Sequence, residues 1–274
     1  MSKAELTISN EQLLLPLGDQ RVNLNLRLFE PAETRSTLVA FHGFVGNSLD
    51  FLPLAQMLGR NGIRVVAPDM LGRGESVHLA DPSGYTLANM LQAAAAALAK
   101  FGPDSVVLGM GWGALIASLG LGVARVRPRK LIALDLPLDF SIDSDPVILR
   151  AFADRGRSFA TAGEIVADLR TSPEFAGLPA GADLSHRLRM DGARYRLSHD
   201  DEVTHRTADF GGRGYDLRRV LAGVGAPTLL MSAGPVSSDL PANCTAIGDL
   251  ATAGRLLLQT PVEQLLVLGF AEAL

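Results

Sequence analysis

The sequence predicts an α/β fold built on a mostly parallel β-sheet with helices on both of its faces. Short apolar runs recur along the chain, and most of them lead into a glycine-containing turn and then a helical pattern. This alternation of strand and helix is typical of parallel sheets. Of the 274 residues, 47% are hydrophobic and 20% are charged, so the chain can bury a sizeable core. The strand-like runs are residues 38–41, 63–67, 105–110, 131–134 and 226–231.

The first of these runs, residues 38–41, leads into a glycine-punctuated loop and a helix. Asn47 and Ser48 are favourable N-cap residues for that helix, because their side chains can accept hydrogen bonds from its first free N–H groups. Gly62 is suited to its C-terminal end. The run at 63–67 then returns the chain to the sheet.

Residues 105–115 combine a buried strand, a glycine-dense turn and the start of a helix. Gly109, Gly111 and Ala114 fit the G-x-G-x-x-A pattern of dinucleotide-binding turns, and Asp135 follows the next strand, where a ribose-binding acid could lie. Such a pattern on its own is weak evidence. The flanking segments therefore decide between this interpretation and its alternative.

These flanks resemble the α/β-hydrolase superfamily. Residues 42–46 (HGFVG) are similar to the oxyanion loop after the third strand of that family, and residues 68–76 (PDMLGRGES) are similar to its PDxxGxGxS turn. Residues 109–113 (GMGWG) then fall on the G-x-S-x-G turn that carries the nucleophile. Residues 261–271 resemble the final helix. A dinucleotide-binding domain explains none of these flanks, so we favour the hydrolase fold.

The resemblance implies an α/β-hydrolase fold with an eight-stranded, mostly parallel sheet and an inserted cap. From about residue 139 to 212 the strand-like runs stop and short helical patterns replace them. We therefore expect a helical cap at 139–212, with residues 1–138 and 213–274 forming the two parts of the core. The helical patterns of the cap cover about residues 145–154, 163–170 and 183–190.

The catalytic triad of the family is not matched. Gly111 takes the place of the nucleophile and has no oxygen or sulfur with which to attack a carbonyl. The position of the acid falls near Ser237, with Asp239 two residues late. Arg255 takes the place of the histidine, and arginine cannot act as a general base because it does not deprotonate at working pH. We therefore expect neither ester nor amide hydrolysis.

The oxyanion end of the pocket does not depend on those side chains. The backbone N–H groups of Phe44 and Trp112, with the N-terminus of the helix that starts there, can still hold a carbonyl or a carboxylate. Trp112 could line the pocket or belong to the core. The residues expected at this pocket are His42, Gly43, Phe44, Met110, Gly111, Trp112 and Arg255.

Several polar residues have a structural interpretation beside the functional one. We expect His42 to shape its loop rather than act as a base, and Asp69 to hydrogen-bond within its own turn. Arg255 either closes an anion site with the helix N-terminus, or reaches solvent or pairs with an acid. His199 and His205 lie near two aspartates, but their spacing is not that of a zinc pair, so we predict no metal and no cofactor.

Three classes of function remain. The first, which we favour, is a non-hydrolytic protein that binds a small apolar, carboxylate or carbonyl ligand, or a protein partner. The second is a lyase, cyclase or isomerase that uses the old pocket, with His42, Asp69 or a histidine of the cap as acid or base. The third is a hydrolase with a non-standard nucleophile, for which Ser232 and Cys244 are the candidates.

Composition limits the partners and the cellular compartment that we expect for the protein. The net charge of −4 and the absence of a basic patch argue against nucleic acid. Cys244 is the only cysteine, so no internal disulfide forms, which is typical of a reducing compartment. The first residues are polar and no apolar run reaches the length of a membrane helix. We expect a cytoplasmic protein without membrane contact.

Overall fold

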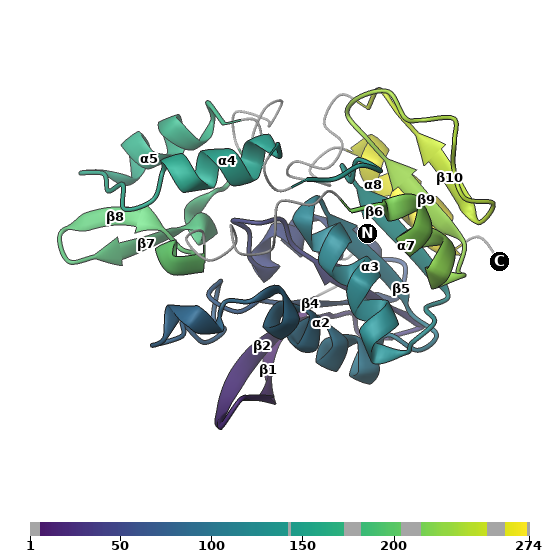
Figure 1. The fold of residues 1–274 in the computed structure, drawn as a ribbon, viewed down its shortest axis with the longest axis horizontal. Helices are drawn as coiled ribbons and strands as arrows, with labels where there is room; N and C mark the ends of the chain where they lie inside the picture. Colours follow the sequence, from purple (N-terminus) through teal and green to yellow (C-terminus); the bar gives the residue numbers. More distant parts are fainter. Residues whose placement is uncertain (1–5, 142–143, 173–181, 204–214, 251–260, 273–274) are drawn as a thin grey trace.

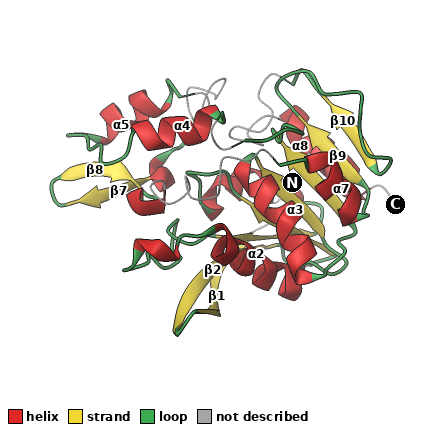
Figure 2. Ribbon diagram, in the orientation of Figure 1, coloured by secondary structure: helices red, strands yellow, loops and turns green. Residues whose placement is uncertain are grey.

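The chain folds into an eight-stranded sheet with helices on both faces (Figures 1 and 2). The computed structural model describes residues 6–141, 144–172, 182–203, 215–250 and 261–272. The strands of the sheet are β1 Thr7–Leu17, β2 Gln20–Glu30, β3 Ser36–Phe41, β4 Ile63–Pro68, β5 Val106–Met110, β6 Lys130–Leu134, β9 Thr228–Met231 and β10 Cys244–Ile247.

Their order across the sheet is β1-β2-β4-β3-β5-β6-β9-β10. The β1–β2 hairpin and the β2–β4 pair are antiparallel, and every other neighbouring pair is parallel. The predicted fold class is therefore confirmed. Because the parallel strands all point the same way, their carboxyl ends meet at one edge of the sheet, where α/β proteins form their sites.

The strands alternate their side chains between two hydrophobic clusters, one on each face. In β3, Leu38 and Ala40 belong to one cluster, and Val39 and Phe41 belong to the other. The helices α2 Leu87–Phe101, α3 Trp112–Ala124 and α7 Leu217–Val224 cover one face, and α1 Leu52–Gly59 and α8 Pro261–Glu272 cover the opposite face.

Small residues and end caps fix these helices in place. A Cβ atom built on Gly120 of α3 would lie 3.0 Å from Ala94 Cβ of α2, so the two helices approach closely at small side chains, as the alanine-rich sequence of α2 requires. At the other face, Lys130 Nζ and Arg129 Nη2 donate to the carbonyls of Phe270 and Ala271. These cations lie at the C-terminal end of α8, where the helix dipole favours them.

The predicted helix start at Asn47 is confirmed with one difference. The Asn47 side chain forms a capping box with Asp50, but it caps the short 3₁₀ turn η1 Ser48–Phe51, and α1 follows directly. Gly62 then has φ of 73°, a left-handed conformation that glycine adopts without strain.

The elements between β6 and α7 form a separate group at one side of the sheet (Figure 1). It contains α4 Pro146–Ala153 and α5 Ala162–Leu169, as the helical patterns predict. Where a helical pattern was expected at 183–190, the chain forms only the short 3₁₀ turn η4 Ser185–Arg187 and then a hairpin of β7 Leu188–Asp191 and β8 Arg194–Leu197. Gly192 and Ala193 form the tight turn between the paired residues Asp191 and Arg194, and Gly192 has φ of 59°; glycine at the first position of a two-residue turn is a hairpin signal.

Candidate functional site

The site is organised around Gly111, which lies on a sharp turn between β5 and α3. Its φ is 49° and its ψ is −116°, and its N–H donates to Leu134 O at 2.7 Å. The strand–turn–helix geometry predicted for this position is therefore present. A residue with a side chain would be strained in this conformation, whereas glycine is not.

The neighbouring glycines are needed for a different reason. A Cβ atom on Gly113 would collide with the carbonyl oxygens of Phe41 and His42, and one on Gly109 would collide with the backbone of Ala114. A Cβ atom on Gly111 would meet only Asp135 O, at 3.9 Å. The space for a side chain at Gly111 is thus open, and only its backbone conformation favours glycine.

Above Gly111 lies a cavity of about 520 Å³, which is in the usual range for small-molecule sites. The carboxyl ends of β3, β5, β6 and β9 form its floor and walls, and most of the lining side chains are apolar. The lining residues are Gly43, Phe44, Met110, Gly111, Trp112, Asp135, Leu136, Pro137, Leu138, Asp139, Asp145, Pro146, Val147, Arg218, Leu230, Met231, Ser232, Ala233, Gly234, Pro235, Val236 and Ser237.

Phe44 and Trp112, which the sequence predicts to supply the oxyanion donors, both line this cavity. Among the described residues, neither backbone N–H donates to another group, and the two rings pack edge to face with centroids 5.6 Å apart. The indole Nε1 of Trp112 is also buried without a hydrogen-bond partner in the described part of the chain. Trp112 therefore both belongs to the core, where it is buried, and lines the cavity, so the two positions expected for it are not alternatives.

A buried arginine supports these two aromatic residues. The guanidinium of Arg73 lies 5.1 Å from the Phe44 ring centroid and 4.7 Å from that of Trp112, and its Nε donates to Phe44 O at 3.0 Å. Burial lowers the pKa of Arg73 to about 9. Arg73 thus fixes the peptide that follows Phe44. We did not predict this role, although Arg73 lies within the PDMLGRGES segment.

His42 has the structural role expected of it. Its ring is buried: Nε2 accepts from Met70 N–H at 3.0 Å, and Nδ1 lies 2.8 Å from Gly43 O. These partners require the neutral ring with the proton on Nδ1. Burial lowers the pKa of His42 to about 4, in agreement with a neutral ring. His42 does not line the cavity; it shapes the loop that does.

Asp69 is likewise held by its surroundings. Its carboxylate accepts from Ser48 N–H at 2.6 Å, from Glu75 N–H at 3.0 Å and from the Asn25 side chain at 2.9 Å. These bonds join η1, the turn after β4 and strand β2. Asp69 is buried and absent from the cavity lining, so both residues proposed above as an acid or base for a non-hydrolytic reaction are engaged elsewhere.

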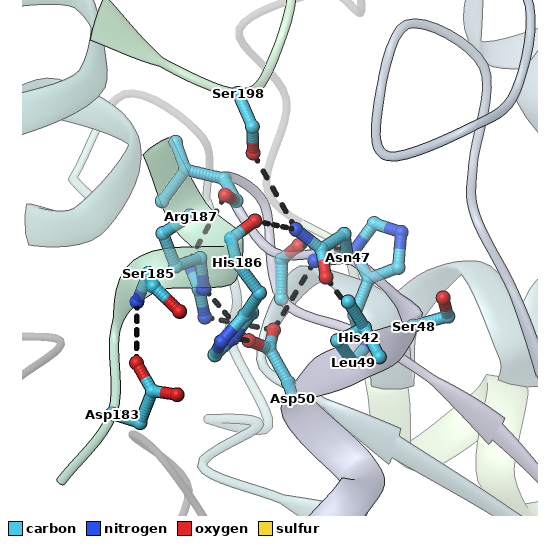
Figure 3. Close-up of polar contacts among 12 residues, drawn as sticks. His42, Asn47, Ser48, Leu49, Asp50, Asp183, Ser185, His186, Arg187 and Ser198 are labelled. Carbon is cyan, nitrogen blue, oxygen red and sulfur yellow. Dashed lines mark hydrogen bonds and ion pairs between the residues drawn. The ribbon is translucent and has the colours of Figure 1, made fainter. Parts of the chain in front are cut away.

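A buried ion pair joins the segment between β6 and β9 to the loop after β3 (Figure 3). Arg187 donates to both carboxylate oxygens of Asp50 at 2.7 Å and to Val45 O at 3.0 Å, and His186 Nε2 lies 2.8 Å from Asp50 Oδ1. Burial alone raises the pKa of Asp50, but Arg187 and His186 outweigh it and lower the pKa to about 2. Sequence reasoning missed this cluster.

The residues expected at the acid and base positions lie in different surroundings, and one of them is not described. Ser237 lines the cavity, whereas the Asp239 side chain is 85% exposed and pairs with Arg218. Arg255 lies outside the described residues. Of the two candidate nucleophiles, Ser232 lines the cavity and its Oγ accepts from Gly234 N–H at 3.1 Å. Cys244 is half-buried and outside the lining, and burial raises the pKa of its thiol.

Within the described part of the chain, no group of His, Cys, Asp and Glu side chains is arranged to hold a metal ion. His199 is among these residues, but His205 is not. Nor does any described helix have the length and apolar composition needed to cross a membrane.

Fold and sequence together identify the family. Residues 36–234 match the model of the α/β hydrolase fold, and the chain therefore belongs to that family. A 3-hydroxybutyrate-oligomer hydrolase of Cupriavidus necator is 33% identical over 108 residues, which are 39% of this chain and only 36% of that enzyme.

Solved structures agree with this assignment. An α/β hydrolase of Novosphingobium aromaticivorans superposes with a TM-score of 0.75 and 19% identity over 99% of both chains. An esterase of Exiguobacterium antarcticum superposes with a TM-score of 0.69 and 17% identity, over 96% of this chain and 100% of the esterase chain. At these identities the likeness shows the fold.

Proposed function

We propose that this chain is a ligand-binding member of the α/β-hydrolase fold that no longer performs Ser–His–Asp acyl transfer. The observation that carries the proposal is Gly111. It occupies the nucleophile turn beneath an open cavity and offers no oxygen or sulfur for attack. Loss of triad members costs about a million-fold in turnover, while the oxyanion donors and the binding pocket keep their function.

The ligand we propose is a small, largely apolar molecule that carries a carbonyl or carboxylate oxygen. Apolar side chains make up most of the walls, and the free N–H groups of Phe44 and Trp112 lie at the floor. The N-terminus of α3 adds a partial positive charge at the same place. Without a nucleophile, these groups hold the oxygen and the bond beside it stays intact.

Loss of hydrolysis is tested with a fluorophosphonate probe and a panel of chromogenic esters. We expect no covalent labelling and no turnover above that of buffer. As a positive control, an active serine esterase is treated in the same way. Native mass spectrometry of the purified chain, followed by calorimetry with short amides and carboxylates, tests for the ligand. Failure of all of them to bind would overturn the small-molecule proposal and favour a protein partner.

A second candidate, hydrolysis by a non-standard nucleophile, is favoured by one observation. Ser232 lines the cavity at the end of β9, although no nucleophile turn surrounds it. Labelling by the probe that disappears in Ser232→Ala, with Cys244→Ala unchanged, would establish this candidate and overturn the first. We expect neither variant to change the result, because the parent protein is not labelled.

A further inference from the structure

The two edge strands of the eight-stranded sheet differ in length. At one edge, β10 has 4 residues, whereas β1 at the other edge has 11. On its inner side β1 pairs with β2 along its whole length, and no described strand pairs with its outer side. The hairpin of β1 and β2 lies at the margin of the molecule (Figure 1). The outer side of β1 therefore presents a long row of backbone N–H and C=O groups.

Strand β1 lacks the features with which proteins usually protect such an edge. These features are a short strand, a lysine, an interior proline or a β-bulge. Residues 7–17 contain no lysine or arginine, and their register with β2 is unbroken. Pro16 lies next to the end of the strand, where its carbonyl accepts from the Gln92 side chain at 2.8 Å. The only charged residue, Glu11, forms an ion pair with Lys100 of α2. Residues 7–15 are therefore suited to pairing with a further strand.

The exposed side chains of β1 are arranged symmetrically about Glu11. The even-numbered residues from 8 to 14 share one face of the strand, and all four are exposed. The two ends of this row are apolar: Ile8 is 45% exposed and Leu14 is 55% exposed. If two copies of β1 pair antiparallel about Glu11, Ile8 of each copy lies opposite Leu14 of the other. No other antiparallel register of β1 with itself brings these two residues opposite each other.

We propose that two copies of this chain form a dimer through antiparallel pairing of their β1 strands, centred on Glu11. Residues 7–15 of each copy join the two sheets into one, with the same patch contributed by both copies, as twofold symmetry requires. Backbone hydrogen bonds and the two pairs of Ile8 with Leu14 stabilise the interface. The two Glu11 carboxylates meet at the centre, where each keeps its own Lys100. This inference does not depend on the proposed function.

Analytical ultracentrifugation over a dilution series tests for the dimer. We expect the parent protein to be dimeric and the variant Ile8→Lys/Leu14→Lys to bind its own copy at least about a hundredfold more weakly, because lysines then lie opposite each other. Mixing this variant with Ile8→Glu/Leu14→Glu should restore a dimer, because each lysine then faces a glutamate. The matched control Val123→Lys/Leu265→Lys changes two exposed apolar residues outside β1 and should keep the parent affinity.

Disulfide cross-linking tests the register in a Cys244→Ala background, which removes the only native cysteine. Residues directly opposite each other in antiparallel strands have Cα atoms about 4.5–5.5 Å apart, within the range of a disulfide. We therefore expect Glu11→Cys to form a covalent dimer under mild oxidation. Asn10→Cys should not, because it lies opposite Gln12 and is about 7–8 Å from its own copy.

Three results would overturn the proposal. They are a parent protein that stays monomeric over the dilution series, a dimer that the lysines in β1 do not weaken, and cross-linking of Asn10→Cys without cross-linking of Glu11→Cys. Circular dichroism shows whether each variant is folded. If Ile8→Lys/Leu14→Lys does not fold, the comparison of Glu11→Cys with Asn10→Cys decides the question, since both change exposed or half-buried residues.

Discussion

At the scale of single residues, the conformation of Gly111 gives a physical reason for glycine at a position that, under the proposed function, has lost its nucleophile. A side chain in its conformation costs on the order of 1–3 kcal/mol, which an enzyme tolerates when the side chain is the nucleophile. Once that oxygen is not needed, glycine relieves the strain and leaves the turn unchanged. The turn itself depends on Gly113, where the backbone of β3 and of the following loop leaves no room for a side chain.

These two glycines should therefore respond differently to substitution. We expect Gly111→Ala to fold and to lower the free energy of unfolding by about 1–3 kcal/mol, through backbone strain alone. Gly113→Ala should be more damaging, because its Cβ meets the carbonyls of Phe41 and His42, which are fixed backbone atoms. Urea denaturation followed by circular dichroism measures both.

The control for these variants is Gly122→Ala in the same helix. Nothing lies within 4 Å of a Cβ at Gly122, so alanine should stabilise α3 by up to about 1 kcal/mol. If Gly113→Ala were as stable as the parent protein, the close contact between α3 and the loop after β3 would be contradicted.

At the scale of elements, the pair of Arg187 and Asp50 is a buried link between the inserted segment and the core. Both side chains are almost fully buried, and the same guanidinium also donates to Val45 O, in the loop that carries Phe44. The pair therefore fixes the inserted segment to the loop at the floor of the cavity. The Asn47 side chain adds a bond to His186 O at 2.8 Å (Figure 3).

Removing only one partner of this pair should lower the free energy of unfolding strongly. In Arg187→Met, Asp50 keeps a buried charge without its guanidinium, and we expect a loss of about 3–5 kcal/mol in the free energy of unfolding. The double variant Asp50→Leu/Arg187→Met should recover much of that loss, because no buried charge remains. The more exposed pair of Arg155 and Glu202 provides the contrast: Glu202→Ala should cost less than about 1 kcal/mol. Additive losses in the double variant would contradict a coupled buried pair.

The elements show what the sequence could and could not predict. The parallel strands β3, β4, β5, β6 and β9, the helix start at Asn47 and the turn at Gly111 follow from local signals, such as apolar runs, a capping side chain and glycines, and they were predicted. The hairpin of β7 and β8 was missed because the polar stretch near 183–190 was taken for a helical pattern, although Gly192 signalled a turn. Arg187 and Asp50 are 137 positions apart, and no local pattern indicates a contact of that kind.

At the scale of the whole molecule, buried histidines set how stability depends on pH. Burial lowers the pKa of His42 to about 4, and burial together with the cations Arg73 and Arg187 lowers the pKa of His199 to about 3. In the unfolded chain both rings bind a proton near pH 6.5. Between that pH and about pH 4, the unfolded state therefore binds more protons than the folded state, and stability is lost as the pH falls.

We expect the free energy of unfolding to drop by about 2 kcal/mol for each of these two histidines between pH 7 and pH 5, because a shift of one pKa unit corresponds to 1.36 kcal/mol. Chemical denaturation at a series of pH values measures this slope. The variant His199→Phe should reduce this slope by about half, because one of the two titrating rings is removed. The variant should fold, because Nδ1 of His199 has no hydrogen-bond partner among the described residues and an apolar ring therefore loses little there. Asp50 contributes nothing to this window, because its pKa of about 2 keeps it charged throughout. Stability that stays constant from pH 7 to pH 5 would show that His42 and His199 are protonated in the folded protein, and the neutral, loop-shaping role of His42 would then be wrong.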